Sequence, residues 1–286
     1  MRILKRKKGR TEYFYLQHSF RNNSDIITKE KYLGKKIPDN IEEIKQELKK
    51  EEQEILYRKL EKIKENFQKE WIKYPESVKK IEKEEIAIAF TYNTNALEGS
   101  TITLEETREV VQTKTAPNKS LGDIKETEAH FKVFLESILK KERMSIFLLL
   151  KWHKRIFQET KEDIAGKFRE YPIRVGNYTA PDWQDVKKLM EGFIRFVNQT
   201  EINPVELAFR AHYKFEKIHP FGDGNGRIGR LITNYVLWHN KYPIFILEHK
   251  RRKSYYKSLQ KDEGGFVNYL FRRYFNMHKQ RYLNEK

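Results

Sequence analysis

Apolar residues three and four positions apart recur along most of this chain of 286 residues, and this spacing predicts a mainly α-helical protein. The longest run begins after Pro38, Asp39 and Asn40, reaches Trp71 and stops before Pro75, so a single helix of about 30 residues is expected there. Further helices are expected at residues 77–99, 123–140, 145–158, 204–217 and 225–239, from residue 251 and around 266–282.

Two stretches break the helical spacing. Residues 11–33 carry β-branched and aromatic residues on both sides of a polar turn at 21–24, which predicts a small N-terminal β-hairpin. Residues 167–181 mix β-branched residues with glycine and proline and predict a second hairpin. The expected fold is therefore a helical bundle with a hairpin inserted in it and another at its N-terminal end.

The segment from His219 to Arg230 reads His-Pro-Phe-Gly-Asp-Gly-Asn-Gly-Arg-Ile-Gly-Arg and connects two of the predicted helices. Its glycines let the backbone come close to a ligand, and the dipole of the following helix adds positive potential at that point. Arg227 and Arg230 share one face of this helix, where their guanidinium groups can bind phosphate oxygens. The segment therefore predicts an anion site.

Two more side chains in the same segment carry chemistry. Asp223 is a hard oxygen ligand in a cationic loop, which fits a bridging cation such as Mg²⁺. His219 can take up a proton near neutral pH. Taken singly, such a histidine is more often a cap and such a turn a tight connection, but the whole set in twelve residues favours a reactive site.

This segment resembles the signature of Fic proteins, which transfer AMP. The matching residues are His219, Phe221, Asp223, Gly224, Asn225, Gly226, Arg227 and Arg230. The resemblance implies a mostly helical core that binds ATP with Mg²⁺ and moves AMP to a Ser, Thr or Tyr hydroxyl of a target protein. His219 is then the general base, Phe221 anchors the loop and Asp223 holds Mg²⁺. Residues 224–226 cradle phosphates, and Arg227 and Arg230 bind the β and γ groups.

Thr94, Glu98 and Gly99 resemble the inhibitory helix of self-inhibited Fic proteins, in which this helix precedes the core. The resemblance implies that Glu98 pairs with Arg230 and competes with the γ-phosphate. Glu98 lies in the last turn of its predicted helix, where the dipole disfavours an acid, so a cationic partner is expected on physical grounds too.

Two peripheral elements follow from the same resemblance. Ile173, Arg174 and Val175 lie in the flap, the hairpin that docks a target segment by strand addition; a hairpin without a partner is the alternative. Tyr255 and Tyr256 resemble the adenine-side wall, and burial in the core is their alternative.

Four regions are expected from these assignments. They are a basic β-hairpin at 1–38, a long charged helix at 39–75, the inhibitory-helix region at 76–115 and a Fic core at 116–286.

Charge and composition add a further partner. The formal net charge of +17 favours an anionic partner, and basic residues 5–8, Arg10 and Arg21 interleave with tyrosines near the N-terminus, which suits nucleic acid; a solvated basic tail is the alternative. No cysteine occurs, and no apolar run reaches the roughly 20 residues of a membrane helix. We therefore expect a soluble cytoplasmic protein without membrane contact, and a homo-oligomer stays open.

Three functions are compatible with the sequence. The first is a self-inhibited protein adenylyltransferase. The second is altered chemistry in the same pocket: removal of AMP by a water that Glu98 activates, or transfer of another nucleotide. The third is a nucleic-acid-associated protein that senses nucleotide, and the presence of His219 argues against it because a sensor needs no general base.

Overall fold

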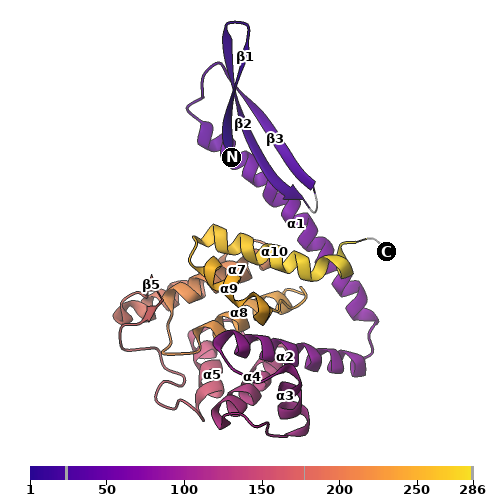
Figure 1. Ribbon diagram of the computed structural model, residues 1–286, viewed down its shortest axis with the longest axis vertical. Coiled ribbons are helices and arrows are strands. Elements are labelled where there is room, and N and C mark those ends of the chain that lie inside the picture. The colour runs from indigo at the N-terminus through magenta and orange to yellow at the C-terminus, as the bar shows by residue number, and fades with distance from the viewer. Residues whose placement is uncertain (23–24, 177, 285–286) are drawn as a thin grey trace. The chain divides into compact units, whose positions relative to one another are not determined.

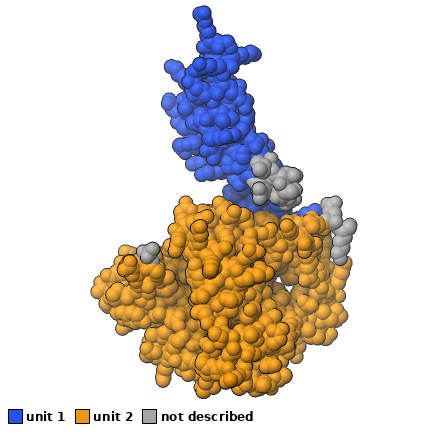
Figure 2. Space-filling view, viewed as in Figure 1, with its two compact units in different colours: residues 1–62 blue, residues 63–286 orange. Residues whose placement is uncertain are grey.

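The computed structural model describes residues 1–22, 25–176 and 178–284 and separates the chain into two compact units, Met1–Lys62 and Ile63–Lys286 (Figure 2). The division falls inside the long charged helix α1, Ile41–Lys73, so the segment expected as a region of its own contributes to both units. This helix begins and ends within two residues of the predicted positions, because Pro38 and Pro75 bracket its apolar spacing.

The first unit contains a three-stranded antiparallel sheet, not the two-stranded hairpin expected at 1–38 (Figure 1). Strand β1, Arg2–Lys8, pairs with β2, Thr11–Asn22, which pairs with β3, Asp25–Gly34. The basic residues 5–8 therefore belong to an edge strand and not to a solvated tail, and residues 23–24 of the expected polar turn lie outside the described part.

The two faces of this sheet differ in character. Leu16 and Leu33 pack against Leu48 of α1 and form the small core of the unit. Side chains alternate across a strand, so Tyr13 and Tyr15 lie on the other face, where both rings contact Tyr32. The sheet has one covered and one open face.

The second unit is helical and surrounds α8. Figure 1 shows α8 with α7 along one side, and α2, α4 and α5 also pack against it. The main helices of the unit after α1 are α2 Glu76–Glu98, α3 Leu104–Arg108, α4 Leu121–Leu139, α5 Ile146–Phe157, α6 Val186–Gln199, α7 Pro204–Ile218, α8 Asn225–His239, α9 Arg252–Leu259 and α10 Glu263–Tyr282. Short helical turns lie at Glu109–Thr113, Trp183–Asp185 and His249–Arg251, and the strands β4 Arg174–Val175 and β5 Tyr178–Thr179 form the inserted hairpin.

Local sequence signals set the ends of the helices that carry the site. Asn203 caps α7 with its side chain on the amide of Val205, and Pro204 occupies the first turn. Thr103 and Glu106 form a capping box at the start of α3, and α2 ends at Gly99 in a left-handed conformation. These ends fix where Glu98 and His219 enter the site.

Helix α6 has no counterpart among the predicted elements. Its buried residues Val186, Met190 and Phe193 follow helical spacing, and Asp182 caps the short turn that leads into it. The signal was therefore present in the sequence. No helix in the described ranges is both long and apolar enough to cross a membrane.

Candidate active site

The loop between α7 and α8 has a defined shape without any ligand. His219 ends α7 in a left-handed conformation with φ 51°, and Gly224 starts α8 with φ 76°. The Asn225 amide closes the loop, accepting from the amide of Phe221 at 2.9 Å and donating to its carbonyl at 2.8 Å. The Phe221 ring is fully buried and stacks on His153 at 3.9 Å between centroids, so the loop is anchored in the core.

Two loop glycines are required by close neighbours. Gly224 has a positive φ, and the ring of Phe157 lies against the position that a Cβ would occupy there. At Gly226, the carboxylate of Glu98 and the guanidinium of Arg230 occupy that space. The missing side chain at Gly226 is therefore what lets a carboxylate reach the N-terminus of α8.

The arginines of α8 are buried and incompletely bonded. Arg227 pairs with Glu126 of α4 and lies over the ring of Phe157, with 4.4 Å from Cζ to the centroid. Arg230 donates from Nε to Thr94 Oγ1 at 2.5 Å and from Nη2 to the Thr94 carbonyl at 3.1 Å. Among the residues that the structure describes, Nε of Arg227 and Nη1 of Arg230 have no hydrogen-bond partner although both are buried. Two charged donors are left for an anion.

Glu98 occupies part of this anion site. Its Oε1 accepts from Arg230 Nη2 at 2.5 Å, and its Oε2 accepts from the Tyr256 hydroxyl at 3.3 Å. Burial alone lowers the pKa of Arg230, but the Glu98 carboxylate outweighs it and the net shift is upward. The arginine therefore stays charged in its buried position.

A polar cavity of about 240 Å³ lies beside this pair, bordered by α2, α4 and the loop. Lys161 crosses it, with Nζ 2.6 Å from Asp223 Oδ2 and 3.0 Å from Glu126 Oε1. Burial raises the pKa of Asp223, but its hydrogen bond with Lys161 and the charge of Arg227 more than offset this and hold the pKa below its usual value. Asp223 is thus an ionised carboxylate whose present partner is a cation.

Charges in the site balance without a ligand. In the described part of the chain, the carboxylates of Glu98, Glu126 and Asp223 face the cations of Lys161, Arg227 and Arg230, and each is paired. No described group of three or more acidic or histidine residues is arranged to hold a metal. An anionic ligand must therefore displace a carboxylate or bring a cation of its own.

His219 is oriented by neighbours that sequence reasoning missed. Its Nδ1 donates to the carbonyl of Glu216 at 3.3 Å and lies 3.9 Å from the Glu216 carboxylate, which leaves the lone pair on Nε2. Arg169 donates from Nε to the His219 carbonyl at 2.8 Å and from two further nitrogens to carbonyls of residues 171 and 181. Glu216 lies three residues before His219 in the sequence, and this helical spacing is a signal from which the contact could have been predicted.

Glu126 and Lys161 were also missed, and no local pattern in the sequence marks them. Lys161 lies 62 residues before Asp223, which it contacts, and Glu126 lies 101 residues before Arg227, which it contacts. His153 is a comparable case: its Nδ1 accepts from the amide of Gly166 and its Nε2 donates to the Asp223 carbonyl. Burial lowers the pKa of His153 to about 4, so the ring is neutral near pH 7.

The two tyrosines of α9 differ in burial and in their contacts. Tyr255 is fully buried and its hydroxyl bonds to His212 at 2.9 Å, so its ring faces no open space. Tyr256 is half-buried and contacts Glu98 and the carbonyl of Leu97. Of the pair, Tyr256 borders the site.

The inserted hairpin contacts the site at its base. Arg174 and Val175 of β4 are exposed, and the Ile173 carbonyl accepts from the amide of Ala180. Tyr178 of β5 donates to the carbonyl of Lys217, two residues before His219. The exposed edge is therefore tied to the end of α7.

Residues 144–237, from just before α5 into α8, match the Fic/DOC family. The chain contains a Fic/DOC domain. The matched part includes the whole loop from His219 to Arg230, whereas α2 and Glu98 lie before it. The family expected from the sequence is confirmed by this match.

Relatives of the Fic domain extend over more of the chain. The chain is 33% identical over 192 residues to the protein adenylyltransferase Fic of Drosophila ananassae, and the match covers 65% of this chain and 39% of the fly protein. It is 34% identical over 184 residues to the protein of the same name from Nematostella vectensis, covering 62% and 43%. The chain thus spans about two fifths of the length of these relatives.

Solved structures give the same fold. Fic-1 of C. elegans, residues 134–508, has a TM-score of 0.71 and 25% identity and covers 85% of this chain and 77% of that one. A Fic-domain signaling protein from Bacteroides thetaiotaomicron has a TM-score of 0.67 and 24% identity, with 78% and 96% covered. The helical Fic fold is therefore shared over most of the present chain.

Proposed function

We propose that this protein is an adenylyltransferase that moves AMP from ATP to a Ser, Thr or Tyr hydroxyl of a target protein. The observation that carries the proposal is the pair of buried, unpartnered donors, Arg227 Nε and Arg230 Nη1, at the N-terminus of α8. A triphosphate supplies the oxygens that these donors lack, and the helix dipole favours its charge. The relatives named protein adenylyltransferase support the same chemistry.

His219 is the general base of this reaction. Its Nε2 takes the proton of the target hydroxyl as that oxygen attacks the α-phosphorus, and pyrophosphate leaves with the electron pair of the broken P–O bond. The bond from Nδ1 to the Glu216 carbonyl sets the tautomer in which Nε2 is the acceptor. Glu216 and Arg169 position the ring and the backbone of His219.

The donor set fits Mg²⁺ carried by the nucleotide. Asp223 supplies one half-exposed, ionised carboxylate, and Mg²⁺ in nucleotide sites is commonly held by one or two carboxylates together with phosphates and water. The ion would neutralise phosphate charge. Lys161, which now pairs with Asp223, marks that carboxylate as a position that already binds a cation.

The position of Glu98 supports the proposal that the enzyme inhibits itself. Its carboxylate stands over Gly226 and on Arg230, where the terminal phosphate would bind. One guanidinium cannot serve both anions at full strength, so ATP binds productively only when Glu98 withdraws. The exposed edge of β4, with Arg174 and Val175, is the proposed dock for the target segment, and Tyr256 is the aromatic residue next to the nucleotide.

Intact-mass spectrometry tests the proposal. The Glu98→Gly chain incubated with ATP and Mg²⁺, alone and with host-cell extract, is expected to add one AMP to itself or to an extract protein, with label from the α-phosphate and none from the γ-phosphate. His219→Ala in the same background is the matched control and should add nothing. Label that follows the γ-phosphate would mean phosphoryl transfer and would refute the assignment.

A second activity is favoured by the open face of the N-terminal sheet: binding of single-stranded nucleic acid. Residues 1–36 hold eleven lysines and arginines and three acidic residues. On the open face, the rings of Tyr15 and Tyr32 lie 5.3 Å apart, and Cζ of Arg6 is 4.6 Å from the Tyr15 centroid. Bases stack on such rings while lysines bind the backbone.

Fluorescence anisotropy with a labelled oligonucleotide tests this activity. Replacing both Tyr15 and Tyr32 by Ala should weaken binding by about 2 kcal/mol or more at fixed salt, because stacking contributes about 1–3 kcal/mol per base. Lys8→Ala, which changes a lysine on the same face of β1 as Arg6, should instead reduce the salt slope by about one. If neither change affects binding, the open face does not bind nucleic acid, and the basic residues of this sheet serve only as a solvated surface.

A further inference from the structure

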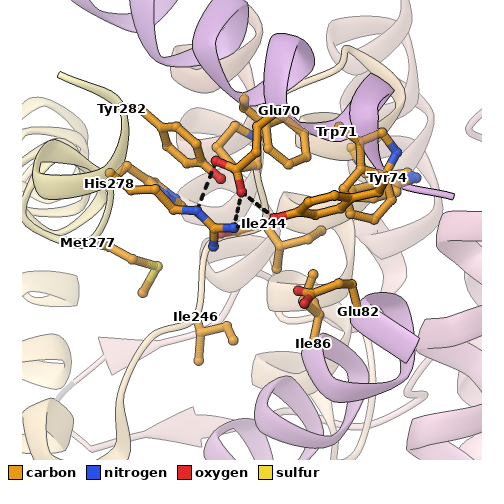
Figure 3. A pocket seen from close by; sticks show the side chains of 14 residues that line it. Glu70, Trp71, Tyr74, Glu82, Ile86, Ile244, Ile246, Met277, His278 and Tyr282 are labelled. Carbon is orange, nitrogen blue, oxygen red and sulfur yellow. Dashed lines mark hydrogen bonds and ion pairs between the residues drawn. The ribbon is translucent and has the colours of Figure 1, made fainter. Parts of the chain in front are cut away.

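A second cavity, of about 210 Å³, lies in the helical unit away from the active site (Figure 3). It is bordered by the last turns of α1, the first turns of α2, the end of α8 and α10. We call it the aromatic pocket, because its ring-bearing walls are Phe67, Trp71, Tyr74, Trp238 and Tyr282. None of these residues has a role in the proposed AMP transfer.

The rings are arranged as adjacent walls and not as a parallel stack. Trp71 and Trp238 lie 5.4 Å apart at an interplanar angle of 86°, and Trp71 and Tyr74 lie 6.0 Å apart at 62°. These pairs meet edge to face, so rings of different orientation border one space. Aromatic rings around a space are a setting in which proteins hold alkylated ammonium groups.

Two carboxylates line the pocket, and they differ in their partners. Glu70 accepts from the Tyr74 hydroxyl at 2.6 Å and from Nε of Arg281 at 3.1 Å. Figure 3 shows the carboxylate of Glu82 turned toward the space of the pocket. Within the described ranges, Glu82 has neither a hydrogen bond nor an ion pair. Arg281 pairs with Glu70 and leaves Glu82 without a cationic partner there.

The remaining titratable groups leave the pocket negative. Burial lowers the pKa of His278 to about 4, so this ring is neutral near pH 7. Burial raises the pKa of Tyr282 to about 12, with Glu70 and Glu82 adding to the rise and Arg281 opposing it. Among the described residues that line the pocket, two carboxylates therefore stand against one cation, in a chain whose net charge is +17. Because charges beyond about 8–10 Å are screened, a cation inside the pocket responds mainly to the groups that line it, which are Glu70, Glu82, Arg281 and the rings.

The apolar walls and the size define the group that fits. Ile86 and Ile244 line the pocket beside Glu82, so the site offers a surface for methylene groups next to its acid. Its 210 Å³ lies below the roughly 300–1,000 Å³ of pockets for whole drug-sized ligands. A slender apolar stem with a compact cationic head matches both features.

We propose that the aromatic pocket receives the alkylammonium side chain of a lysine from a protein partner. The stem packs on Ile86 and Ile244, and the ammonium group pairs with Glu82 against the rings of Trp71 and Tyr74. Glu70 stays bound to Arg281 and holds the wall of α10 in place.

Fluorine NMR of the chain labelled with 5-fluorotryptophan tests the proposal. The chain has four tryptophans, of which Trp71 and Trp238 line the pocket while Trp152 and Trp183 do not and serve as internal controls of folding. Titration with Nα-acetyl-lysine methylamide should shift only the signals of Trp71 and Trp238. The norleucine analogue, which has the same stem without the charge, should shift neither.

Variants separate charge from packing. Glu82→Gln should weaken binding of the lysine derivative about fivefold, as expected for a partly exposed ion pair near 1 kcal/mol. Glu84→Gln makes the same charge change on the same helix outside the pocket and should leave binding unchanged. Equal binding of the norleucine analogue, an unchanged affinity in Glu82→Gln, or the absence of any shift would overturn the proposal. Tighter binding of free butylammonium than of the lysine derivative would assign the pocket to a free amine and would overturn it as well.

Discussion

Lys161 holds Asp223 through a contact of 2.6 Å between its Nζ and Oδ2. The same nitrogen lies 3.0 Å from Oε1 of Glu126, so one ammonium group bridges two carboxylates of the site. A divalent cation that approaches Asp223 must therefore share it with Lys161 or displace it.

Lys161→Met is expected to lower the Mg²⁺ concentration that is required for ATP binding. The Asp223 side chain is about half exposed, and exposed ion pairs contribute about 0.2–1 kcal/mol, so half-saturation by Mg²⁺ should occur at a concentration up to about fivefold lower. Calorimetric titration of ATP over a range of Mg²⁺ concentrations in a Glu98→Gly background measures this. Lys167→Met, a change of the same kind at an exposed lysine nearby, should behave as the parent; a higher Mg²⁺ requirement in Lys161→Met would contradict the competition.

Glu98→Gly is expected to increase AMP transfer. A charge-assisted contact of this type is worth about 1.5–3 kcal/mol, which corresponds to a productive population roughly ten- to hundredfold larger. Incorporation of α-labelled AMP reports the gain, and Glu84→Gln on the same helix is the control. If Glu98 also activates water that removes AMP, labelled protein should persist after ATP is withdrawn. Equal labelling of parent and variant at all ATP concentrations would contradict self-inhibition.

His219→Ala in the Glu98→Gly background should lose AMP transfer by about 10²–10⁴-fold while its affinity for ATP stays within about twofold of the Glu98→Gly chain. The reason is that the phosphate donors are on α8, whereas the ring of His219 makes its hydrogen bond to Glu216. Labelling kinetics and calorimetry on one preparation separate the two quantities. Undiminished transfer would remove His219 from the mechanism.

Stability should fall on acidification from pH 6.5 toward pH 4. His278 has a pKa of about 4 when folded because it is buried, against about 6.5 when unfolded, so between these values the unfolded chain binds more protons. Its contribution, about 3 kcal/mol, is fully present above pH 6.5 and is lost as the pH falls to about 4. Urea unfolding at several pH values should show a drop smaller by about this amount in His278→Gln, whereas the exposed His249→Gln should follow the parent.

Local signals account for what the sequence predicted well. The bounds of α7 and α8 and the loop between them follow from helical spacing, Pro204 and the glycines, and the Glu98–Arg230 pair followed from a family pattern. Glu126 and Lys161 were missed because only tertiary packing brings them to Arg227 and Asp223. Strand β1 was missed because a basic segment resembles a solvated tail until its pairing with β2 is known.

The amide clamp of Asn225 on Phe221 has a kinetic consequence. The loop keeps its shape through its own hydrogen bonds, so the nucleotide enters a preformed site. Under the proposed inhibition, the Glu98 carboxylate must leave this site before the nucleotide binds productively. Inhibition of this form raises the ATP concentration needed for half-maximal rate and leaves the rate at saturation close to that of the relieved enzyme. Under the proposed self-inhibition, the rate of AMP transfer would follow the surrounding ATP concentration, with a threshold set by how readily the Glu98 side chain leaves Arg230.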